Sequence, residues 1–91
     1  MFEALPGWDL VAEGLIDLQN GKKTIPALLV AIGAPKLRQI GFDLPTFNIT
    51  LPEHSLYDLL AEEDSDSAHS KYNALIRKLV SFERAASCVK K

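Results

Sequence analysis

The sequence is short of the residues that build disulfide scaffolds, zinc centres and membrane spans. Its 91 residues include one cysteine, Cys88, so neither an intrachain disulfide nor a cysteine-based zinc site can form. The longest uninterrupted apolar run, Ala27 to Ile32, is far shorter than the roughly 20 residues that cross a bilayer. The first residues lack the basic start and apolar stretch of a secretory signal. We therefore expect a soluble, cytoplasmic protein with no membrane partner.

Neither sign of charge prevails along the chain. Ten Lys and Arg residues against 12 Asp and Glu give a net charge of −2, which argues against a protein that coats nucleic acid through bulk charge. The composition, 47% hydrophobic and 24% charged, is typical of a globular protein and argues against disorder. The length suits a single helical domain over residues 1–91. A domain this small buries only about 60–65% of its unfolded surface, which favours a protein that also has a partner surface.

Apolar residues recur at spacings of three and four between Gly, Pro and Asn residues that end helices. This pattern predicts an all-α fold, a small bundle of four main helices plus one short helix. The long C-terminal helix is expected to be the spine that carries the shorter helices side by side. The predicted helices cover, in order, residues 8–19, 24–33, 35–40 (the short one), about 50–62 and about 67–89.

Local signals add detail at the helix ends and in the core. Thr24 is a predicted N-cap, and Thr50 with Glu53 has the spacing of a capping box. Residues 46–51 alternate apolar and polar side chains as in a strand, but no second strand is available to pair with them. We therefore expect residues 42–51 to form an extended connector. Trp8 is expected to anchor the first helix at the core or its rim. The predicted core residues are Leu59, Leu75, Ile76 and Leu79.

The charged residues are grouped in blocks. Residues 1–21 hold four acids and no base, and residues 22–41 hold four bases and no acid. Residues 42–66 hold seven acids and no base, whereas residues 67–91 hold six bases and one acid. The simplest interpretation is that neighbouring segments pack with complementary rims. The alternative is that one basic block faces an acidic partner or a phosphate backbone.

No arrangement of catalytic or metal-binding residues stands out. His69 and Glu83 fall on one predicted helix 14 residues apart, about 21 Å, and cannot form a direct pair. His54 is expected to be exposed, and Cys88 falls on a polar helix face near a chain end. The acidic residues 62–66 lack the glycine and distal glutamate of a calcium loop. We therefore expect no catalytic residue, no metal and no cofactor, which favours a protein that is not an enzyme without deciding the question.

Residues 24–41 require a separate interpretation because they contain a helix, a turn at Gly33 and a second short helix. A helix-turn-helix protein would place its recognition helix there. Only Arg38 and Gln39 on that helix have side chains that make bidentate base contacts. A small DNA- or RNA-binding regulator is thus an alternative function, and an enzyme subunit whose site forms only in a complex is another.

The favoured function is a non-enzymatic interaction module that associates with a protein partner or a second copy of itself. The apolar stripe of the long C-terminal helix is wide, and its last turns lie furthest from the predicted short helices. These turns are therefore expected to remain uncovered, with basic residues beside them. The predicted interface residues are Phe82, Ala86 and Val89 with the rim Arg77, Lys78 and Arg84.

Overall fold

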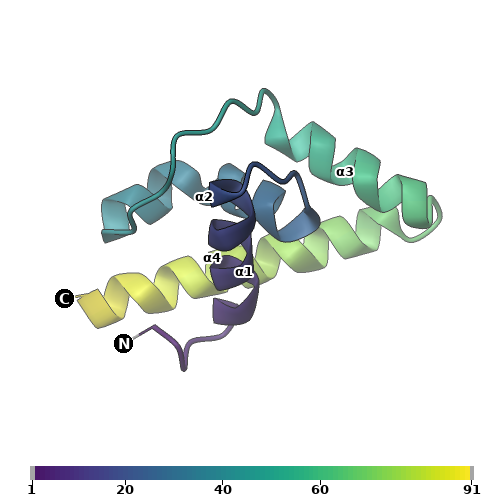
Figure 1. The fold of residues 1–91 in the computed structure, drawn as a ribbon. Coiled ribbons are helices and arrows are strands. Elements are labelled where there is room, and N and C mark those ends of the chain that lie inside the picture. Colours follow the sequence, from purple (N-terminus) through teal and green to yellow (C-terminus); the bar gives the residue numbers. More distant parts are fainter. Residues whose placement is uncertain (1, 91) are drawn as a thin grey trace.

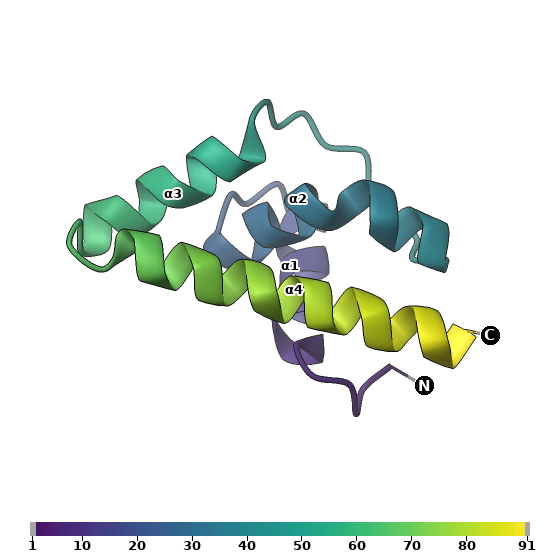
Figure 2. The same ribbon diagram turned by 180° about the vertical axis from the view of Figure 1, so that it is seen from behind.

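The computed structural model of the protein describes residues 2–90 and shows a bundle of four α-helices within them, without a strand (Figure 1). The helices are α1 (Trp8–Gln19), α2 (Ile25–Ile40), α3 (Pro52–Glu63) and α4 (Ala68–Lys90). The all-α prediction is confirmed. Seen from either side, α4 runs along the whole molecule, with α3 folded back from its start and α1 crossing the bundle (Figures 1 and 2).

The central helix of the bundle is α2, which packs against α1, α3 and α4. Nine of its 16 residues are buried, so its surface is apolar around most of its circumference. This is the pattern of a helix enclosed by its neighbours rather than of one that lies on a surface. The long helix α4 spans the molecule as predicted, but α2 joins the other three helices.

The predicted break between residues 33 and 35 does not occur, because α2 continues through Gly33 and Pro35 to Ile40. Pro35 lacks the N–H that would bond to Ala31, and a proline inside a helix costs about 3 kcal/mol. Beyond it, Leu37 and Ile40 are 0% and 4% exposed. Burying two such side chains contributes roughly 3–6 kcal/mol, which offsets the cost of the proline. The segment predicted as a separate short helix is therefore the end of α2.

The helix ends confirm one capping prediction and overturn the other. The Thr24 hydroxyl accepts a hydrogen bond from the Ala27 N–H at 3.3 Å and donates one to the Asp17 carboxylate of α1. Thr24 therefore caps α2 and also ties it to α1. At α3 the N-cap is Leu51 in a left-handed conformation, φ 54°, and no side chain caps the helix, so the predicted Thr50–Glu53 capping box does not form.

The core consists of two apolar clusters along α2. One lies between α2, α3 and the first half of α4 and includes Leu79, which is buried as predicted. Three other predicted core residues, Leu59, Leu75 and Ile76, are only half-buried at its edge. The second cluster joins α1, one side of α2 along most of its length, and the second half of α4.

Four aromatic rings close the second cluster. Phe82 lies against the rings of Phe2, Trp8 and Phe42, with centroid distances of 6.3, 6.0 and 5.7 Å. Trp8 itself is half-buried, so it anchors α1 at the rim of the core as predicted. Rings at these distances, tilted toward one another, pack favourably.

The predicted exposure of Phe82 and Ala86 is wrong, because both side chains are fully buried. The cause is again the continuity of α2, whose last turns reach this part of α4 and bring Leu37 and Ile40 into the same cluster. Val89 remains exposed, at 40%. Two of the three predicted apolar interface residues, Phe82 and Ala86, are thus covered within the chain, whereas Val89 is not.

The connector between α2 and α3 is extended and unpaired, as predicted. Its apolar side chains, Phe42, Leu44, Phe47 and Ile49, are partly buried against the second cluster. None of the helices within residues 2–90 is long and apolar enough to cross a membrane.

Candidate binding site

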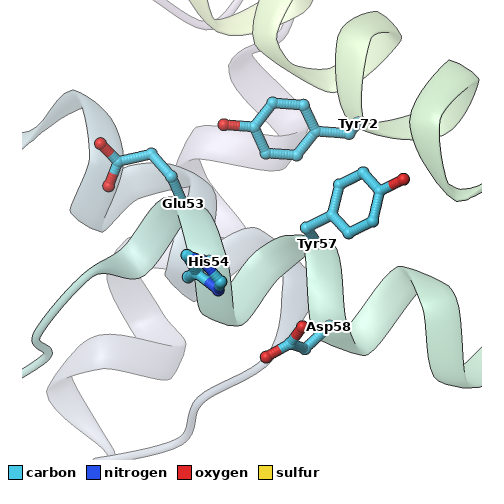
Figure 3. Close-up of a pocket in the computed structure, with 5 residues that line it drawn as sticks. All are labelled: Glu53, His54, Tyr57, Asp58 and Tyr72. Carbon is cyan, nitrogen blue, oxygen red and sulfur yellow. The ribbon is translucent and has the colours of Figure 1, made fainter.

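A pocket of about 300 Å³ lies where α3 faces the first turns of α4 (Figure 3). Four of the side chains that line it project from α3, and Tyr72 reaches over from α4. The lining residues are Glu53, His54, Tyr57, Asp58 and Tyr72. The pocket combines two aromatic rings with two carboxylates, which is the main chemical feature of this surface.

The amphipathic pattern of α3 places these side chains together. Leu56 and Leu60 are buried against α2 and α4, and they fix which face of α3 points inward. The four α3 residues of the pocket occupy positions 53, 54, 57 and 58, a spacing of one and four residues that forms a continuous strip along the helix. All four are exposed, including His54, as predicted.

The two tyrosines form the apolar wall of the pocket. The ring centroids of Tyr57 and Tyr72 are 5.8 Å apart and the rings are tilted by 57°. Tyr57 is 38% exposed and Tyr72 is half-buried, so ring surface remains accessible. A partly exposed pair of tyrosines offers both apolar contact area and a negative ring face to a ligand.

The charge around the pocket is negative. Glu53 and Asp58 stand on either side of Tyr57 in the strip, and α3 carries no Lys or Arg. Residues 42–66 as a whole hold seven acids and no base. A site with carboxylates beside aromatic faces favours an organic cation, above all the planar guanidinium of arginine, which stacks on rings and pairs with carboxylates.

The structure does not bring the predicted interface residues into this pocket. Arg77, Lys78 and Arg84 are exposed on α4. The pocket residues Tyr57 and Tyr72 were not predicted as a site, because Tyr72 fits the apolar stripe of the long helix. The signal that could have found them is chemical: tyrosine in a stripe of leucines carries a polar end that tends to reach solvent.

The other residues considered as catalytic or metal-binding candidates lie apart from one another. His69 is exposed, and its ring Nε2 lies 3.2 Å from the amide Nδ2 of Asn73, one turn further along α4. Cys88 is exposed near the end of the same helix. Within residues 2–90, no group of three His, Cys, Asp or Glu side chains is arranged to hold a metal ion. In the acidic segment, the Asp66 N–H donates to the Asp64 carboxylate at 3.2 Å, so this segment forms the turn between α3 and α4.

The helix-turn-helix arrangement considered as an alternative is not formed by residues 24–41. A single helix occupies residues 25–40, and the turn required at Gly33 is absent. Arg38 lies over the ring of Phe47 with its guanidinium carbon 5.6 Å from the ring centroid. This arginine is therefore engaged with the connector rather than presented as part of a recognition helix.

Glu83 is a titratable group whose pKa is shifted by burial. It is half-buried on α4, and its Oε2 would lie only 3.0 Å from a Cβ atom at Gly33 of α2. Burial raises the pKa of Glu83 above its ordinary value, although the nearby Lys36 ammonium lowers it in part. The cost of burying the carboxylate is therefore only partly offset by the Lys36 ammonium.

Replacing Glu83 with glutamine is expected to stabilise the protein at neutral pH. The pKa of Glu83 is raised in the folded protein, so the folded state favours the protonated carboxyl. As the pH rises through this pKa the carboxyl ionises and the folded state loses stability. Glutamine cannot ionise and therefore avoids this loss. Thermal unfolding of both proteins between about pH 3.5 and 7 tests this. The midpoint of Glu83→Gln should exceed that of the wild type at pH 7 and converge with it at the acid end. The exposed Glu63→Gln is the control, and equal gains from both substitutions would contradict the prediction.

Comparison of the chain with models of protein families, with curated proteins and with solved structures gave no match in any of the three. The function is therefore inferred from the pocket and its surroundings alone.

Proposed function

We propose that this protein is a small helical interaction module that binds a basic segment of a protein partner, with an arginine side chain in the pocket between α3 and α4. The observation that supports the proposal is the partly exposed Tyr57–Tyr72 ring pair, 5.8 Å apart, in one pocket with Glu53 and Asp58. The favoured function remains non-enzymatic association, as expected from the sequence. The proposed binding surface is the junction of α3 and α4 rather than the end of α4 that the sequence suggested.

The chemistry of the pocket selects for a guanidinium group. Its flat face stacks on a tyrosine ring, and its N–H groups donate in parallel to a carboxylate. A cation over an aromatic ring contributes about 0.5–1 kcal/mol at an exposed site and roughly 2 kcal/mol when desolvated. Lysine lacks the planar fork and is more strongly hydrated, so it binds more weakly. Tyrosine and arginine are also the residues that most often dominate protein interfaces.

The proposal is tested with a short peptide that carries one arginine between neutral residues. Calorimetric titration compares it with the same peptide in which uncharged citrulline, a near-isostere, replaces arginine. We expect binding of the arginine peptide and a loss of at least about tenfold for the citrulline peptide, which corresponds to roughly 1.4 kcal/mol. Equal binding of the two peptides would contradict a cation site.

Two double variants with the same change in charge locate the site. Glu53→Gln with Asp58→Asn removes the pocket carboxylates and should weaken the arginine peptide at least about tenfold. Glu62→Gln with Glu63→Gln removes two exposed acids of the same helix that do not line the pocket, and should have less than about a twofold effect. Equal losses in both variants would mean that only the overall negative charge attracts the peptide.

A further inference from the structure

We propose that the arginine is supplied by a second copy of this chain, from the outer face of α4. This inference rests on the proposed function, because it names the occupant of the same pocket. The chain would then associate head to tail, with Arg77 or Arg84 of one copy in the pocket between α3 and α4 of the next.

Only two arginines of the chain are candidates for insertion into the pocket of another copy. The sequence contains three arginines, Arg38, Arg77 and Arg84. Arg38 already lies over the Phe47 ring in its own chain. Arg77 and Arg84 are both exposed on α4. They are seven residues apart, so they lie on nearly the same side of the helix, about 10.5 Å apart along its axis.

The outer face of α4 and the exposed face of α3 have opposite charges. Lys71 and Lys78 are exposed on α4 together with the two arginines. The one acid in α4, Glu83, is half-buried and close to Lys36 of α2, so it does not neutralise this face. On α3 every charged side chain is acidic and exposed: Glu53, Asp58, Glu62 and Glu63. A basic face and an acidic face on one small molecule attract between copies, which raises the association rate and sets the orientation.

The geometry of α4 requires two copies. Arg77 follows the pocket residue Tyr72 by five residues, which places the two side chains about 140° apart around the helix. Arg84 is a further two turns away, about 18 Å from Tyr72 along the axis. Neither arginine can therefore occupy the pocket of its own chain, and a neighbouring copy has to provide it.

The pocket and the arginines face different directions, because Tyr72 and Arg77 lie about 140° apart around α4. A single two-fold contact therefore cannot pair both pockets with both arginines, and the contact is heterologous. Such a contact leaves one free pocket and one free basic face after each addition, and assemblies grow into chains or close into rings. The mean mass should therefore rise with concentration beyond a dimer. Since the interacting charges are exposed, added salt should dissociate the assemblies.

Two complementary variants test this arrangement by sedimentation velocity at low salt. The pocket variant is Glu53→Gln with Asp58→Asn, and the helix variant is Arg77→Gln with Arg84→Gln. All four residues are exposed, so both variants should fold, and circular dichroism checks this. Each variant alone should be a monomer. An equimolar mixture should form a 1:1 complex and nothing larger, because the basic face of the pocket variant still fits the pocket of the helix variant.

The possible results separate this inference from the proposed function. If the wild type remains a monomer at millimolar concentration while the helix variant binds the arginine peptide, self-association is wrong and the pocket has another partner. If neither self-association nor peptide binding occurs, both proposals are wrong. A helix variant that associates as strongly as the wild type, or a mixture that stays monomeric, also overturns the inference. So does a monomeric wild type whose basic face retains it on DNA in a salt-dependent way.

Discussion

Alanine at position 14 is expected to destabilise the protein by about 3 kcal/mol or more, although alanine is the better helix former. A Cβ atom at Gly14 would overlap the Pro26 carbonyl oxygen and a methyl group of Val30. Both belong to α2, so α1 and α2 would have to move apart. Overpacking typically costs 1–3 kcal/mol and more in severe cases, and here the clash is with the Pro26 backbone, so we expect a cost of about 4 kcal/mol. Subtracting the gain of about 1 kcal/mol in helix propensity leaves a net loss of about 3 kcal/mol. A loss of 3 kcal/mol lowers the unfolding midpoint by roughly 12–24 °C in a domain of this size.

Gly33→Ala is the matched control, because Gly33 is also buried at a helix crossing. The nearest atoms to a Cβ there are the Glu83 carboxylate and the Leu79 methyl groups, at 3.0 Å and 3.0–3.1 Å. These are the ends of flexible side chains and can move by a few tenths of an ångström, whereas the Pro26 carbonyl belongs to the backbone. We therefore expect a change within about 1 kcal/mol for Gly33→Ala, near the propensity difference itself. Equal effects of the two substitutions in urea unfolding would contradict the close contact at Gly14.

Truncation of Phe82 to alanine is expected to cost about 3–5 kcal/mol in the free energy of unfolding. The side chain is fully buried, and it contacts three other aromatic rings from the N-terminal segment, α1 and the connector. Its removal leaves a cavity at the point where these segments meet α4. A glutamate at this position would place an uncompensated charge in the same cavity and should unfold the protein rather than separate two copies.

Val80→Ala tests whether the loss at Phe82 reflects burial. Val80 precedes Phe82 by two residues on α4 and is 37% exposed. Its truncation should change the free energy of unfolding by less than about 0.5 kcal/mol. Chemical unfolding monitored by circular dichroism measures both variants. If Phe82→Ala were as mild as Val80→Ala, the aromatic cluster would not be part of the core.

Most of the helix boundaries could be predicted from the sequence because their signals are local. The bounds of α1 follow from Asn20 and Gly21 at its end, and those of α3 follow from Pro52 and the acidic turn after Glu63. A cap, a turn residue or an apolar spacing acts within about four positions along the chain, so its effect can be recognised without knowing the rest of the fold. The exposure of Arg77, Lys78 and Arg84 was equally predictable, since charged residues on a helix face opposite its apolar stripe remain in water.

Local sequence signals do not show which segment of the chain covers a given apolar helix face. The sequence by itself determined an all-helical chain with a long final helix and an extended connector. Only the tertiary structure carried α2 past Pro35, because the burial of Leu37 and Ile40 outweighs a lost hydrogen bond, and this in turn buried Phe82. The approach of Tyr57 to Tyr72 also depends on how α3 folds back on α4. Packing energy is summed over residues that are distant in the chain. It therefore determines such contacts where local preferences favour no structure or favour a different one.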